Sequence, residues 1–194
     1  MSDPRPWTYA ALYGTLWGAV ELTAGTALKM SRVPLAGTVL AVVGLACMVT
    51  LRRLQPRPGV CLLAGVVAAF LKVFSLGGLM IGPMLGIVGE AALVELAFTV
   101  IGTRLPGATL AGALALMEAP LQKLATTWLA LGSEAILAVV RAAQGLVERL
   151  GLEPPSPLAL LGLVLGVFAT LGAAAGTWAW RLAGRVERRL GGGP

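Results

Sequence analysis

The sequence contains no histidine. Histidine is the commonest metal ligand in proteins and a frequent general base, so its absence argues against a metalloenzyme inside the membrane. The sequence also lacks a P-loop, a G-x-S-x-G motif, a pair of aspartates and a Cys-x-x-Cys motif. Enzymes use these patterns to bind phosphates, activate a serine or hold metals. We therefore expect that the chain is not an enzyme and that it carries no metal or cofactor.

Charged residues are also scarce. They make up 12% of the chain, against 57% hydrophobic residues, whereas soluble domains usually carry about twice that charged fraction. This composition predicts an integral membrane protein with membrane lipid around it. The only two cysteines, Cys47 and Cys61, lie in or beside apolar runs and are expected to be free thiols that pack as small hydrophobic side chains.

The apolar residues form runs long enough to cross a bilayer, which takes ~20 residues in a helix. We predict an all-α fold: one polytopic membrane domain over residues 1–194, built as a bundle of six transmembrane helices with an extra outer amphipathic helix. The predicted spans cover about 7–28, 33–51, 60–74, 79–102, 106–131 and 157–180. The third span is short, which indicates little tilt or an end inside the protein.

The arginines predict an orientation, because cytoplasmic loops carry an excess of basic residues. Nine basic residues fall on one side of the predicted bundle: Arg5, Arg52, Arg53, Arg57, Arg104, Arg181, Arg185, Arg188 and Arg189. Four fall on the other: Lys29, Arg32, Arg141 and Arg149. Both termini are therefore expected in the cytoplasm and the chain in the inner membrane. Because the basic residues sit at helix ends, the net charge of +6 does not indicate nucleic acid.

Residues 133–150 differ from the spans. Glu134, Arg141 and Glu148 recur every seven residues and so share one helical face. We expect a helix that lies at the outer surface or folds over the bundle, as a connector or as a lid; re-entry into the membrane is a third option. The proline-rich segment "LEPPSP" should end it.

Six ionisable residues lie within the predicted spans. They are Glu21, Lys72, Glu90, Glu95, Glu118 and Lys123. A charge at bilayer depth costs about 2.5–3.5 kcal/mol even on lenient scales, so such residues normally face the bundle interior. The predicted spans put all except Glu95 at mid-depth or in the outer half of the membrane. They predict a substrate site open to the outer side, formed by Glu21, Lys72, Glu90, Glu118, Lys123 and Trp128, which follows Lys123 by one or two turns.

The two acids of "GEAALVEL", Glu90 and Glu95, should have separate roles. They differ by five positions, or roughly 140° around a helix, and cannot enter one site in the same way. We expect Glu90 in the site and Glu95 in packing or partner contact. A purely structural alternative is that Glu21, Glu90 and Glu118 neutralise Lys72 and Lys123. A proton or ion relay is a further option.

Glycine and proline favour a cavity at the outer start of the fourth span, where "SLGGLMIGPMLG" holds Gly77, Gly78, Gly82, Pro83 and Gly86. Pro120 interrupts the fifth span between Glu118 and Lys123. Broken helices at membrane depth are tolerated where they face protein or a cavity.

Small residues form two rows along the first span. Ala10, Gly14 and Gly18 make one row; the other is Ala11, Thr15, Ala19, Thr23 and Ala27. Such rows let another helix approach closely. Packing within the chain and docking of a partner both remain open at this point.

Several features belong together: the length, the six predicted spans, the cytoplasmic termini, the segment "ALYGTLWGAVELTAG" and the span pair "LLAGVVAAFLKVFSLGGLMIGPMLGIVGEAALVEL". In these features the chain resembles the S components of energy-coupling factor (ECF) transporters over roughly residues 8–182. This resemblance implies capture of a vitamin-like small molecule near the outer face. It also implies a transmembrane T protein and two ATPases as partners, with Ala10, Gly14 and Gly18 docking the T protein. The cobalt and nickel S proteins use histidine and are set aside.

Two alternatives to this expected function stay open. One is a non-catalytic structural subunit of a larger membrane complex, in which the Glu–Lys pairs serve only stability. The other is a stand-alone ion-coupled carrier. No inverted repeat favours the carrier.

Overall fold

The computed structural model describes residues 5–31, 35–74, 81–149, 151 and 153–191. These residues form six α-helices and no strand, which confirms the all-α prediction. The helices are α1 (Arg5–Met30), α2 (Ala36–Leu54), α3 (Val60–Lys72), α4 (Ile81–Ile101), α5 (Leu105–Arg149) and α6 (Pro157–Gly191). Gly77 and Gly78 lie outside the described residues.

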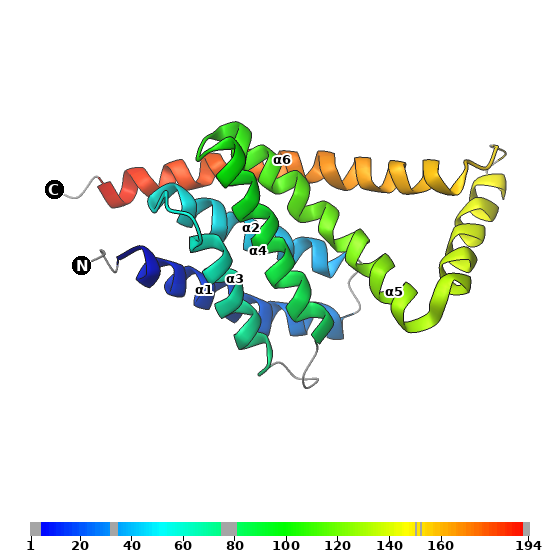
Figure 1. Ribbon diagram of the computed structural model, residues 1–194, viewed down its shortest axis with the longest axis horizontal. Helices are drawn as coiled ribbons and strands as arrows, with labels where there is room; N and C mark the ends of the chain where they lie inside the picture. Colours follow the sequence, from blue (N-terminus) through cyan, green and yellow to red (C-terminus); the bar gives the residue numbers. More distant parts are fainter. Residues whose placement is uncertain (1–4, 32–34, 75–80, 150, 152, 192–194) are drawn as a thin grey trace.

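Four of the helices, α2, α4, α5 and α6, are long and apolar enough to cross a membrane. Helix α3 is apolar but shorter. This pattern is typical of a membrane protein. The first residues of α1 and the last residues of α6 lie at the same end of the bundle (Figure 1).

Helix α5 contains a sharp change of direction at Gly132, where φ is 77° and ψ is −176°. Residues with a side chain rarely adopt this φ, so glycine permits the turn. The turn separates the predicted fifth span from the predicted amphipathic helix. Pro120 does not break α5, which corrects our expectation of an interruption there: the helix continues through it. Proline removes one backbone hydrogen bond, and the remaining bonds and packing keep this helix continuous.

After Gly132 the second part of α5 stands away from α1–α4 and leads to the start of α6, so that the two parts of α5 and the first half of α6 outline a triangle (Figure 1). Gln144 joins two sides of it by donating from Nε2 to the carbonyl oxygen of Pro155 at 2.9 Å. Glu134, Arg141 and Glu148 are exposed together, as their spacing predicts. The expectation that this helix folds over the bundle is wrong, because Gly132 directs it outward.

Small residues permit close contact between several pairs of helices, including α5 with α6 and α1 with α3. At Gly112 of α5 and Gly172 and Gly176 of α6, an added Cβ would collide with the backbone of the opposite helix. At Gly14 and Gly18 of α1, it would come within 2.6 Å of the Ala64 carbonyl oxygen and 2.7 Å of a Leu71 side-chain carbon in α3. Glycine at these positions therefore permits interhelical approach.

The row Ala10, Gly14 and Gly18 packs inside the chain. Ala10 is completely buried, and the two glycines are buried against α3. Docking of a partner on these three residues is therefore wrong, because α3 already occupies that face. The second row, Ala11, Thr15, Ala19, Thr23 and Ala27, is exposed along its whole length.

Candidate functional site

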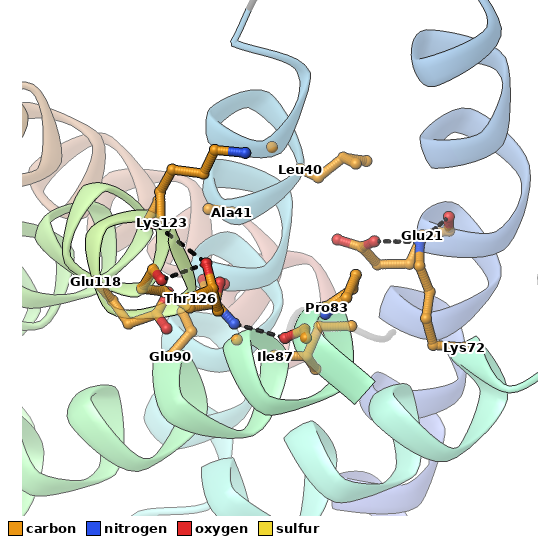
Figure 2. Close-up of a pocket in the computed structure, with 15 residues that line it drawn as sticks. Glu21, Leu40, Ala41, Lys72, Pro83, Ile87, Glu90, Glu118, Lys123 and Thr126 are labelled. Atoms are coloured by element: carbon orange, nitrogen blue, oxygen red, sulfur yellow. Dashed lines mark hydrogen bonds and ion pairs between the residues drawn. The ribbon is translucent and has the colours of Figure 1, made fainter. Parts of the chain in front are cut away.

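A cavity of about 460 Å³ opens among α1–α5, at the end of the bundle opposite the start of α1 (Figure 2). We call it the polar cavity. Among the described residues, its lining combines ionisable and amide side chains with aliphatic walls and contains no aromatic residue: Glu21, Gly37, Leu40, Ala41, Lys72, Gly82, Pro83, Gly86, Ile87, Glu90, Glu118, Ala119, Gln122, Lys123 and Thr126. The volume lies within the range of pockets that hold small molecules.

On one wall, Glu21 of α1 and Lys72 of α3 form an ion pair. Lys72 Nζ lies 2.8 Å from Glu21 Oε2 and donates a second hydrogen bond of 2.8 Å to the Glu21 backbone oxygen. Both residues are buried. Gly25 leaves room for this pair, since a Cβ there would lie 3.2 Å from Lys72 Nζ. The structural alternative, charges that neutralise each other and join helices, applies to Glu21 and Lys72.

On the opposite wall, two acids lie close together without such a partner (Figure 2). Glu90 of α4 is only 5% exposed, and its Oε1 makes no hydrogen bond with any residue that the structure describes. Glu118 of α5 is partly buried beside α4, where Gly89 provides space: a Cβ at Gly89 would lie 3.3 Å from Glu118 Oε1. Burying a polar group without a hydrogen bond is costly, so Glu90 is a group that lacks its partner.

The rest of this wall comes from one face of α5. Gln122 Nε2 donates to the Gly82 carbonyl oxygen at 2.5 Å and so bridges α5 to the first turn of α4. The Thr126 hydroxyl donates a hydrogen bond to the Gln122 carbonyl oxygen at 2.8 Å. Lys123 is exposed at the rim, and its amine makes no ion pair within the described part of the chain (Figure 2).

Five of the six predicted substrate-site residues line this one cavity: Glu21, Lys72, Glu90, Glu118 and Lys123. Trp128 does not; its side chain is 56% exposed elsewhere on α5. The structure therefore removes Trp128 from the site, because it lies on a different face of the helix. Gly82, Pro83 and Gly86 line the cavity, as expected from the glycine- and proline-rich segment.

Gln122 and Thr126 were missed by the sequence analysis. Their signal was available: with Glu118 they form a row of polar residues spaced by four on an apolar helix, and this spacing places side chains on one face. Residues 133–149 contribute nothing to the polar cavity, so this helix is not a lid over it.

Glu95 lies apart from the polar cavity. Its Oε1 accepts a hydrogen bond from Arg52 Nη1 at 2.8 Å, and its Oε2 accepts one from the Cys61 backbone N–H at 2.9 Å. Arg52 also donates to the Arg57 carbonyl oxygen. Of the two roles expected for Glu95, packing and partner contact, these contacts within the chain fit packing, and they lie apart from Glu90.

A second cavity, the apolar cavity, lies within the triangle of α5 and α6. It measures about 640 Å³. Its lining is aliphatic except for Lys123: Pro120, Lys123, Leu124, Ile136, Val139, Val140, Ala143, Pro157, Leu158, Leu160, Leu161 and Val164. Lys123 therefore stands between the two cavities.

No group of three or more His, Cys, Asp or Glu side chains that could hold a metal occurs within the described ranges. Comparison of the chain with protein-family models, with curated proteins and with solved structures gives no match.

Proposed function

We propose that this chain is the membrane-embedded, substrate-binding subunit of an importer of the ECF type, capturing a vitamin-like small molecule in the polar cavity. The observation that carries the proposal is Glu90, a buried carboxylate that faces a 460 Å³ cavity with one oxygen unpartnered. A stable fold avoids such a group unless something else satisfies it. A bound solute supplies what the chain lacks.

The proposal includes six spans, both termini in the cytoplasm and the inner membrane as location. The basic residues support this orientation, since nine of them gather at the end that carries both termini. The polar cavity lies at the opposite end, so in this orientation it opens to the outer side. A subunit without ATP-binding motifs needs other chains to drive release, and we propose a T protein and two ATPases.

Co-purification tests the binding role. The protein is purified in mild detergent and its bound small molecules are identified by native mass spectrometry. We expect one small molecule per chain, lost in Glu90→Gln and retained in Glu134→Gln, which changes the same group at an exposed position outside both cavities. Wild-type protein without any bound small molecule, combined with no effect of Glu90→Gln on solute uptake by cells, contradicts the proposal.

A structural subunit of a larger complex is the second candidate. It is favoured by the interhelical ion pairs Glu21–Lys72, Arg52–Glu95 and Arg53–Glu187. Affinity purification from native membranes separates the two. Recovery of ATPases with a membrane partner supports the importer; recovery of an unrelated complex, with no bound solute, supports the structural role.

A further inference from the structure

We propose that the solute held in the polar cavity presents a cationic, N–H-rich group, such as an amidinium or a protonated amine, to Glu90 and Glu118. This inference rests on the proposed function and deepens it by naming the chemical class of the substrate. It begins from Glu90. This side chain is only 5% exposed, and its Oε1 makes no hydrogen bond with any residue that the structure describes.

Two of the neighbouring donors, Lys72 and Gln122, are already engaged. Lys72 directs its amine to Glu21 through two hydrogen bonds of 2.8 Å. Gln122 uses its amide nitrogen on the Gly82 carbonyl oxygen. The occupant of the cavity is therefore well placed to donate the hydrogen bond that Glu90 Oε1 does not receive from the described residues.

The charge of this wall determines whether a cation or an anion is favoured in the cavity. Glu118 lies beside Glu90 (Figure 2), and the Glu21–Lys72 pair adds no net charge. Lys123 is the remaining cation of the lining, and it is exposed at the rim. A carboxylate on this wall attracts a cation and repels an anion. A planar N–H pair also matches the two oxygens of a carboxylate in a bidentate contact.

The other walls define the body of the solute. Leu40, Ala41, Pro83, Ile87 and Ala119 are aliphatic, and the lining holds no aromatic ring. Recognition of the cation by an aromatic face is thus not available among these residues. The carboxylates must provide it, while the aliphatic walls contact an apolar or flat body.

The test uses three probes of nearly the same shape and different charge: benzamidinium, benzamide and benzoate. Their affinities for the full chain in detergent are measured by calorimetry. We expect benzamidinium to bind best and benzamide about tenfold more weakly, as the loss of a hydrogen bond to a charged group predicts. Benzoate should bind weakest.

Variants give the sign of the effect. Glu90→Gln should weaken benzamidinium about tenfold, and Glu118→Gln should weaken it less, because Glu118 is less buried. Lys123→Met should tighten benzamidinium binding, since it removes a like charge at the rim. Glu134→Gln is the matched control and should have no effect. If Glu90→Gln does not fold, Glu118→Gln and Lys123→Met should still change the affinity for benzamidinium in opposite directions.

Preferred binding of benzoate that Lys123→Met abolishes overturns the inference, as does the absence of any benzamidinium binding. Unchanged benzamidinium affinity in both glutamate variants overturns it too. The proposed function is judged separately by co-purification. A bound solute that proves to be an anion leaves the importer role in place and removes only the cationic class.

Discussion

The two ends of the bundle treat buried charge in opposite ways. At the end near the termini, Glu95 receives hydrogen bonds from both the Arg52 side chain and the Cys61 backbone. Arg53 pairs with Glu187 at 2.7 Å while its guanidinium lies 4.3 Å from the centre of the Trp180 ring. At the cavity end, Glu21 and Lys72 are the only ion pair among the described residues, and Glu90 Oε1 makes no hydrogen bond with any of them.

Under the proposed function, this difference separates charges that hold helices together from a carboxyl group that binds a ligand. Removing one member of a closed pair leaves a buried charge without compensation, which is strongly destabilising. Neutralising a charge that has no partner removes a cost instead. Stability and binding measurements on matched variants should therefore move in opposite directions at the two ends.

The largest loss of stability is expected for Arg52→Met. It leaves the carboxylate of Glu95 with only the Cys61 N–H, and the free energy of unfolding should fall by about 3–5 kcal/mol. Thermal unfolding in detergent measures it. The double variant Arg52→Met with Glu95→Leu should recover most of the loss. Equal stabilities of the single and double variants would contradict the pairing.

Lys72→Met comes next. It removes the ion-pair partner of Glu21. Because this carboxylate lines a cavity, water can solvate it in part. We expect a loss at or below about 3 kcal/mol, the low end for breaking a buried pair, and recovery on adding Glu21→Gln. The same unfolding experiment checks this. A loss of stability larger than that of Arg52→Met would contradict the prediction that buried pairs near the termini contribute more than the pair at the cavity.

Arg53→Lys should cost about 1 kcal/mol. The pair with Glu187 is partly exposed, with side chains 24% and 47% exposed, and such pairs contribute little. Lysine also loses the planar stacking on Trp180. The change should appear as a small drop in the unfolding midpoint and as a red-shifted tryptophan emission. Arg185→Lys, at an exposed position of α6, is the control.

The smallest stability effect is expected for Glu90→Gln, at most about 1 kcal/mol, because the amide has nearly the shape of the carboxyl group and the change breaks no ion pair. Solute binding should nevertheless fall. A marked destabilisation without loss of binding would show that Glu90 belongs with the closed pairs of the opposite end.

Much of the fold can be predicted from local patterns. The helices follow the apolar runs, and the change of direction at Gly132 falls between the predicted fifth span and the predicted amphipathic helix. Five cavity residues could be predicted because ionisable groups in apolar helices must face inward. Pro120 and Trp128 were misjudged, since a proline is tolerated in a packed helix and an aromatic residue near a site has no intrinsic direction.

The sequence by itself determined which segments are helical and which charges lie within them, because both depend on neighbours in the chain. Tertiary structure alone decided how each helix is rotated about its axis. That rotation buried Ala10, Gly14 and Gly18 against α3 and left the second row of α1 exposed. It also paired Glu21 with Lys72, 51 positions away, and left Glu90 Oε1 without a hydrogen bond to any described residue. These outcomes depend on contacts between distant helices, which no local pattern encodes.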